Sequence, residues 1–160
     1  MISPVTGEVA FSDGLRFSPH EPLLDSRVHG ARSHSQLPIP GWMQHILGVH
    51  PSEHGFFEVE AVSDSDGRIQ AVLVAHSHSF YQPDTPNDSE RRAYHESVIG
   101  SDLHGQQEFS WGEAFCRLDT EDNKDWLVVV YNVGPQVPLQ RVELLRHLRE
   151  HERLPSSGKA

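Results

Sequence analysis

Cysteine, long apolar runs and basic charge are all scarce in this chain of 160 residues. Its single cysteine, Cys116, excludes an intramolecular disulfide and a metal site built from paired cysteines. No apolar run reaches the roughly 18 residues that a membrane-spanning helix needs. The first residues, 1–8, have neither the basic nor the apolar segment of a secretory signal. We therefore expect a cytoplasmic protein.

Positive charge is in deficit, since 23 acidic residues face 13 basic ones and the formal net charge is −10. Such a surface repels phosphate backbones and anionic lipids, so we expect neither nucleic-acid nor membrane binding. It would attract a basic protein partner and accelerate its capture. A second interpretation, in which the charge only aids solubility, stays open.

Several catalytic signatures are also missing. The chain has no glycine-rich phosphate-binding loop and no dinucleotide-binding fingerprint. His95 and Glu96 begin a zinc-protease helix pattern, but Ile99 stands where the second histidine belongs. Histidine, in contrast, is plentiful, with 12 residues, so the net charge changes greatly between about pH 7.5 and 5.5.

The apolar pattern predicts a mainly antiparallel sheet. Asp13-Gly14 between two alternating runs predicts a hairpin over residues 8–17. Residues 18–40 contain four prolines and are expected to form an irregular loop. Further strands are predicted at residues 56–62, 69–75, 108–118 and 126–131. The second and fourth of these are apolar on both faces, which is typical of central strands.

Helical spacing appears in three places. It predicts a short helix or turn at residues 41–48, a helix from Asp88 or Ser89 to about Ile99, and a C-terminal helix from Pro138 to about His151. We therefore predict an α+β fold, with about five to six strands and two main helices, one of them C-terminal. A single domain is expected over residues 1–153, followed by a disordered tail at 154–160.

The strongest chemical signal is His76-Ser77-His78, directly after the predicted central strand 69–75. Two imidazoles two residues apart on a strand lie on one face, about 6–7 Å apart along the backbone. That spacing allows both rings to bind one zinc or iron ion, and Asp88 is a candidate third ligand. A bound water would then be ionised near neutral pH. The alternative is that both histidines bond only to solvent and backbone.

An apolar strand, His-x-His, a proline-containing loop and a serine before a helix resemble the JAMM (MPN-domain) metalloproteases. The matching residues are His76, Ser77, His78, Pro83, Pro86 and Ser89. The resemblance implies a zinc ion held by two histidines and an aspartate, with a distant glutamate activating the water. The chain departs from the pattern, because Arg92 stands where the aspartate belongs and Ser79 replaces the usual proline.

The opening segment, residues 2–11, is similar to that of small bacterial immunity-type proteins, which neutralise a partner toxin by covering its active site. The resemblance implies that the acidic surface meets a basic patch on the toxin. The candidate contact residues are the acidic side chains of two loops, with one aromatic anchor if it is exposed: Asp64, Asp66, Asp119, Glu121, Asp122 and Trp42. The alternative for Trp42 is a place in the core.

We therefore expect a non-catalytic protein-binding protein without a cofactor, of the kind that an immunity-type toxin inhibitor represents. A metal-dependent hydrolase that holds zinc or iron at His76 and His78 stays open as the alternative.

Overall fold

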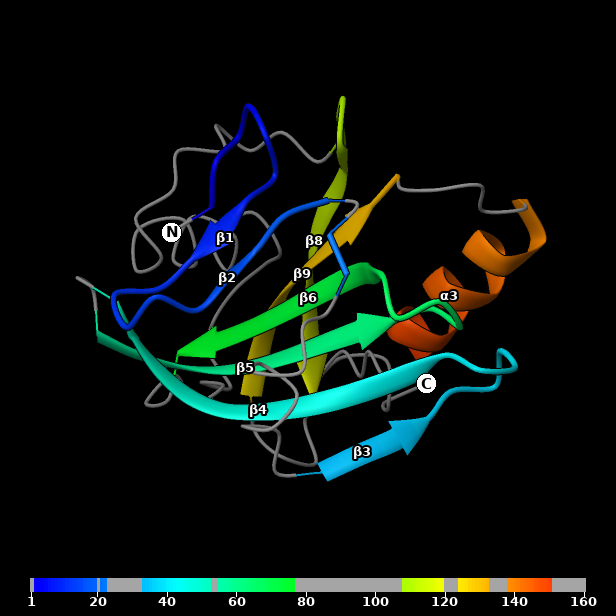
Figure 1. The fold of residues 1–160 in the computed structure, drawn as a ribbon, viewed down its shortest axis with the longest axis horizontal. Helices are drawn as coiled ribbons and strands as arrows, with labels where there is room; N and C mark the ends of the chain where they lie inside the picture. Colours follow the sequence, from blue (N-terminus) through cyan, green and yellow to red (C-terminus); the bar gives the residue numbers. More distant parts are fainter. Residues whose placement is uncertain are drawn as a thin grey trace, which may run out of the picture.

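The fold was taken from a computed structural model, and the residues described below are 2–19, 21–22, 33–52, 55–76, 108–119, 124–132 and 138–150. Two antiparallel sheets and one helix make up this part of the chain (Figure 1). The smaller sheet pairs β1 (Val9–Ala10) with β2 (Arg16–Phe17). The larger has seven strands in the order β3-β4-β5-β6-β9-β8-β7. These are β3 (Ser33–Gln36), β4 (Met43–Ser52), β5 (Gly55–Ser63), β6 (Ile69–His76), β7 (Glu108–Phe109), β8 (Gly112–Asp119) and β9 (Lys124–Tyr131), and the helix is α3 (Pro138–Glu150).

Strands β6 and β9 lie side by side in the interior of the large sheet, with Ala71 opposite Val130 and Leu73 opposite Val128. Every residue of β6 from Ile69 to Ala75 is buried. A strand covered on both faces needs apolar side chains at consecutive positions, and that is the pattern that predicted these two strands. The prediction is confirmed for both.

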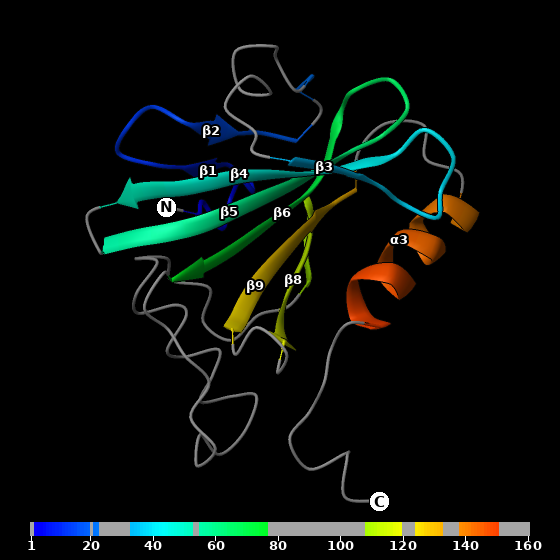
Figure 2. The same ribbon diagram turned by 90° about the horizontal axis from the view of Figure 1, so that it is seen from below.

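The two faces of the large sheet are covered by different elements, so the core has two layers. Hairpin β1–β2 packs on one face, which we call the hairpin face, and α3 packs on the other, the helix face (Figure 2). The hairpin-face core contains Ile2, Val9, Phe11, Phe17, Leu47, Phe57, Val59, Ala61, Ile69, Val72, Val74, Trp111, Ala114, Leu127, Val129 and Tyr131. The helix-face core contains Leu37, Ile39, Trp42, Val62, Ala71, Leu73, Ala75, Phe115, Trp126, Val128, Val130, Leu144 and Leu148. Successive residues of each strand alternate between the two layers.

The predicted α+β class with two main helices is wrong. Among the described residues α3 is the single helix, so this part of the protein is largely β. The second predicted helix, residues 88–99, lies outside the described residues, as does the predicted tail 154–160. No helix of the described part combines the length and the apolar character that crossing a membrane requires.

The short helix predicted at residues 41–48 is also wrong, because Met43–Ser52 form the long strand β4. The pairing of β4 with β5 shifts by one residue between Ile46 and Gly48, so Leu47 is the extra residue of a β-bulge. Ile46 and Leu47 lie on opposite faces, as alternation along a strand requires. An adjacent apolar pair of this kind fits a strand with apolar residues on both faces as well as it fits helical spacing.

Two further predictions need correction. Residues 33–36, expected within an irregular loop, form β3 at the edge of the sheet. The predicted strand 108–118 is interrupted, because Phe109 pairs with Gly112 across a tight turn and the run divides into β7 and β8. The hairpin over residues 8–17 and the C-terminal helix are where the sequence predicted them.

Candidate functional site

The histidine of the predicted metal site that the structure describes is His76, at the end of β6. Its ring meets the edge of the Phe57 ring, with centroids 5.1 Å apart and planes at 90°. A Cβ built on Gly55 would lie 2.9 Å from Nε2 of His76, so the ring also lies close against the β5 backbone. His78 and Asp88 lie outside the described residues. Within the described ranges, no group of three or more His, Cys, Asp or Glu is placed to hold a metal ion.

The predicted acidic contact residues divide by their surroundings. Asp64 begins the β5–β6 turn, where its Oδ1 accepts the backbone N–H groups of Asp66 and Arg68 and its Oδ2 accepts the Gln70 side chain. Such bonds are typical of an aspartate that shapes a turn. Asp66 is exposed at the tip of the same turn. Asp119 is the last residue of β8, opposite Lys124. Glu121 and Asp122 lie outside the described residues.

Trp42, predicted either as an exposed anchor or as a core residue, is in the core. Its side chain is 1% exposed and belongs to the helix-face layer. The buried ring has no surface with which to meet a partner in this conformation.

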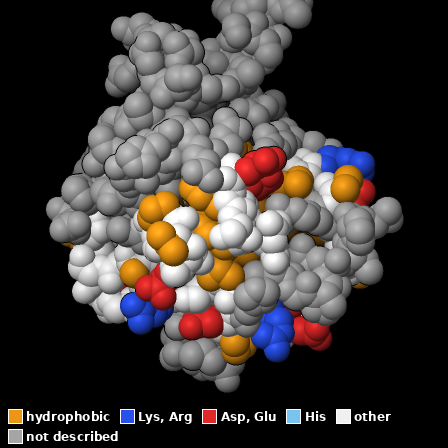
Figure 3. Space-filling view, turned by 90° about the horizontal axis from the view of Figure 1, so that it is seen from above, with side chains coloured by type: hydrophobic (Ala, Val, Ile, Leu, Met, Phe, Trp, Pro, Cys, Tyr) orange, Lys and Arg blue, Asp and Glu red, His pale blue; other side chains and the backbone are white. Residues whose placement is uncertain are grey.

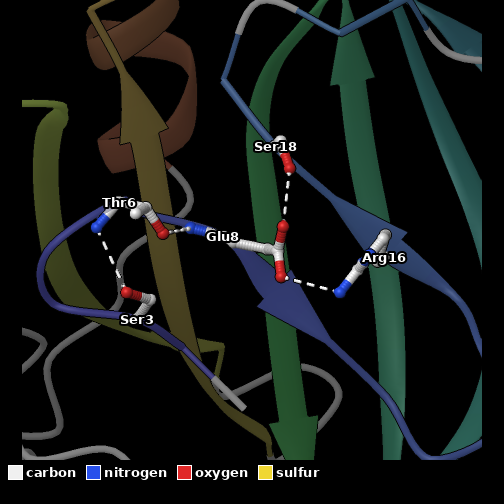
Figure 4. Close-up of polar contacts among 5 residues, drawn as sticks. All are labelled: Ser3, Thr6, Glu8, Arg16 and Ser18. Atoms are coloured by element: carbon white, nitrogen blue, oxygen red, sulfur yellow. Dashed lines mark hydrogen bonds and ion pairs between the residues drawn. The ribbon is translucent and has the colours of Figure 1, made fainter.

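The opening segment folds into a compact turn held by its own polar groups (Figure 4). The Ser3 hydroxyl accepts the Thr6 N–H at 3.1 Å, and the Thr6 hydroxyl accepts the Glu8 N–H at 3.3 Å. The Glu8 carboxylate then accepts bonds from Arg16 and from the Ser18 hydroxyl, each at 3.0 Å. The residues that carry the immunity-type resemblance thus shape a turn and link it to β2.

This turn sits on two aromatic side chains of the large sheet. The Trp111 indole donates to the Pro4 carbonyl at 3.0 Å, and the Tyr131 hydroxyl donates to the Gly7 carbonyl at 2.6 Å. Burial, with smaller contributions from Glu8 and Glu21, raises the pKa of Tyr131 far above its usual value. The hydroxyl therefore keeps its proton, and the bond to Gly7, over the whole working pH range.

The described residues also expose a row of apolar side chains that the sequence analysis did not identify. Ile46 and Val49 of β4 and Phe56 of β5 are 38%, 46% and 56% exposed. Ile46 pairs with Glu60 and Val49 pairs with Glu58. Paired residues of antiparallel strands share a face, and Phe56 shares it too because β5 alternates. We call these five residues, Ile46, Val49, Phe56, Glu58 and Glu60, the β4–β5 strip.

The strip lies on the helix face, at the end of β4 and β5 that α3 does not reach. Gln44 marks the boundary, because its amide nitrogen donates to Glu60 at 2.5 Å while its oxygen lies 3.4 Å from His147 of α3. Strands β4 and β5 contain two glutamates and neither lysine nor arginine. The strip therefore combines exposed apolar area with negative charge.

The face seen from above the view of Figure 1 carries other hydrophobic side chains near its centre, with acidic and basic side chains around them (Figure 3). That view does not identify the residues of the β4–β5 strip. Isolated exposed apolar residues are ordinary, whereas several on one face of a single strand pair are typical of an interaction surface. A sequence signal for the strip does exist, since apolar residues at 46, 47 and 49 cannot all face inward from one strand. The bulge that decides which of them face outward leaves no such signal.

Comparison with known proteins gives one likeness. No family model and no curated protein matches the chain. A chain of the solved structure titled "Rhs1-CT in complex with cognate immunity protein RhsI1" is similar over 91% of this chain and 96% of that chain, with 14% sequence identity and a TM-score of 0.47. At this identity and TM-score, the likeness assigns neither a family nor a function.

Proposed function

We propose that the protein is a non-catalytic binding protein that captures a basic protein partner through the β4–β5 strip, and that it acts as an immunity-type inhibitor of a toxin. The observation that carries the proposal is the row Ile46, Val49 and Phe56, exposed on one face beside Glu58 and Glu60. Protein interfaces commonly place an apolar centre inside a charged rim.

Charge complementarity selects the partner. The net charge of −10, together with two glutamates and no lysine or arginine on β4 and β5, favours a protein with lysine or arginine around an apolar contact. Phe56 is the expected anchor, because large aromatic side chains dominate the energy of many interfaces. Asp66, exposed at the β5–β6 turn, is expected to add to long-range attraction without a close contact.

The inhibitor role adds two considerations to binding. An acidic inhibitor suits a toxin whose active site is basic, because the inhibitor's charge then covers the groups that bind substrate. The segment 2–11 also resembles the opening of immunity-type proteins. In this chain its residues support the hairpin, so we assign contact with the partner to the strip.

The test compares capture from the lysate of the source cells by the wild type, Phe56→Asp and Val142→Asp. Val142 is the control, because it is 52% exposed on α3, away from the strip. We expect the wild type and Val142→Asp to retain the same basic protein. Phe56→Asp should lower the affinity for that protein, once purified, by about thirtyfold or more, as for an interface hot spot.

The inhibitor role requires a second step with the purified partner. Its expression should arrest cell growth, and co-expression of the wild type should restore growth where Phe56→Asp does not. Capture of an acidic protein, or equal capture by Phe56→Asp and Val142→Asp, would refute the proposed partner and surface. A captured basic protein without toxicity would support binding and refute inhibition.

A variant that removes one charge from the strip tests the electrostatic contribution to association with the partner. Glu60→Gln should slow association and weaken its dependence on salt. Glu143→Gln is the matched control, because Glu143 pairs with Arg146 on the exposed side of α3. Equal effects of the two variants would show that charge on the strip has no special part in steering.

A further inference from the structure

His50 lies on β4 next to Val49, and both of its ring nitrogens face oxygen atoms. Nδ1 is 2.7 Å from the Asp13 carboxylate, in the turn of hairpin β1–β2. Nε2 is 2.9 Å from the carbonyl oxygen of Leu47, the bulge residue. The ring also packs against Phe11, with centroids 5.8 Å apart. Beside it, the Ser12 N–H donates to the Pro51 carbonyl at 2.8 Å, so the hairpin meets β4 at two neighbouring points.

The chemistry of the two oxygens specifies the protonation state that makes both bonds. A backbone carbonyl only accepts hydrogen bonds, and so does an ionised carboxylate. Each ring nitrogen must therefore carry a proton, which is the imidazolium form of His50. A neutral imidazole has one N–H and keeps only one of the two bonds.

The bulge decides which residues of β4 lie on the same face as Ile46 and therefore belong to the strip. Because Leu47 is extra, Val49 pairs with Glu58 on the helix face, and His50 pairs with Phe57 on the hairpin face. Without the extra residue, positions 48 and 50 would share the face of Ile46 and Val49 would turn toward the hairpin, since side chains alternate along a strand. The surface that we assign to the partner therefore depends on this irregularity.

We propose that His50 is a positioning residue whose imidazolium form bonds to both Asp13 and the Leu47 carbonyl and thereby stabilises the β-bulge. Because the bulge places Val49 on the β4–β5 strip, the exposure of Val49 there depends on the protonation of His50. Its effect on a partner rests on the proposed function, whereas its effect on the bulge does not. Both bonds require the imidazolium form, so loss of one ring proton removes one of them.

Among the described residues, the charged or titratable groups facing His50 are few. The hairpin supplies Asp13. Strand β5 supplies the uncharged Phe57 opposite His50, and His76 of β6 lies against the far side of that ring. The variant His76→Gln therefore serves as the control for a second histidine on the same face.

The first test uses the free protein. We expect ¹⁵N NMR at pH 5.5 to show protons on both ring nitrogens of His50. Amide hydrogen exchange at residues 47–49, corrected for its intrinsic pH dependence, should lose about fivefold in protection by pH 8, the factor expected for the loss of one hydrogen bond. In His50→Gln and Asp13→Asn, the protection of these amides should already be low at pH 5.5 and should change little between pH 5.5 and pH 8. His76→Gln should behave as the wild type, and so should Asp66→Asn, which alters the other Asp-Gly turn.

An unprotonated ring nitrogen at pH 5.5, or wild-type protection in His50→Gln, would overturn the proposal. If a variant does not fold, the wild-type NMR titration still decides the protonation state. With the captured partner, the wild-type affinity should fall between pH 5.5 and 8 more than that of His50→Gln, and equal profiles would overturn the link to the strip. Failure to capture any basic partner would refute the proposed function and leave the measurements on the free protein unchanged.

Discussion

Replacement of Gly7 by alanine tests how the opening turn is held on the sheet. Gly7 has φ +76°, a backbone conformation that L side chains rarely adopt. A Cβ at this position would lie 2.6–2.9 Å from three atoms of the Trp111 ring. The methyl group therefore meets both a conformational cost and a rigid aromatic surface, and the turn must move away from the ring.

Gly67 separates these two costs. It has the same φ of +76°, but a Cβ there would meet no atom within 4 Å. Gly67→Ala should therefore show the conformational cost alone, about 1 kcal/mol. In Gly7→Ala the displaced turn also weakens the bonds from Trp111 to Pro4 and from Tyr131 to Gly7, each worth about 1 kcal/mol, and leaves buried polar groups poorly paired. We expect a total loss of about 3–4 kcal/mol.

Urea denaturation followed by circular dichroism gives the free energy of unfolding for the wild type and both variants. The expected difference between Gly7→Ala and Gly67→Ala is about 2–3 kcal/mol, which for a chain of this size also lowers the melting temperature by roughly 5–10 °C. Equal losses in the two variants would refute the reasoning, because the contact with Trp111 would then contribute nothing. A smaller loss for Gly7→Ala than for Gly67→Ala would refute it as well.

Three further predictions concern the helix-face core, the contact between Asp13 and His50, and the alternative of a metal-dependent hydrolase. Leu148→Ala should lower the free energy of unfolding by about 2–5 kcal/mol, because Leu148 is fully buried under the sheet, while Val142→Ala on the exposed side of α3 should change it by no more than about 0.5 kcal/mol in urea denaturation. Burial raises the pKa of Asp13. The hydrogen bonds from His50 and Leu15 and the charge of His50 outweigh the effect of burial and hold the pKa of Asp13 below its usual value of 3.8. The ionised Asp13 thus stabilises the fold above its unfolded pKa and loses that effect as the pH falls through its lowered pKa in the folded protein. Asp13→Asn should therefore be less stable than the wild type at pH 6, with a difference that shrinks as the pH falls through that pKa. Elemental mass spectrometry of protein purified without chelators should find no stoichiometric zinc or iron, whereas about one ion per chain, lost in His76→Ala, would favour the hydrolase.

Patterns whose cause is local were the ones that the sequence predicted. Asp13-Gly14 favours a tight turn regardless of what surrounds it, and the hairpin β1–β2 follows from that preference. Strands β6 and β9 are apolar at consecutive positions, which fits only a strand covered on both faces. Helix α3 starts at Pro138, a residue suited to the first turn, and repeats apolar residues at helical spacing.

Sequence patterns that pairing with another strand interrupts could not be predicted from local preference. Residues 41–48 carry helical spacing, yet pairing with β5 makes Met43–Ser52 a strand, and the bulge at Leu47 brings Ile46 and Val49 to the same face. The break between β7 and β8 has a similar origin, since a Cβ on Gly112 would lie 1.9 Å from the Val130 carbonyl and only glycine allows this approach. Each depends on a partner strand that is distant in the sequence.

The candidate site shows the same division. The sequence by itself determined the acidic balance that favours a basic partner, and the hairpin, the two central strands and the C-terminal helix, because charge and local preference are properties of the residues themselves. Only the tertiary structure decided that Trp42 is buried and that Ile46, Val49 and Phe56 are exposed together. Exposure depends on which face of a strand is covered, and one extra residue in a strand pair reverses the face of every side chain that follows it.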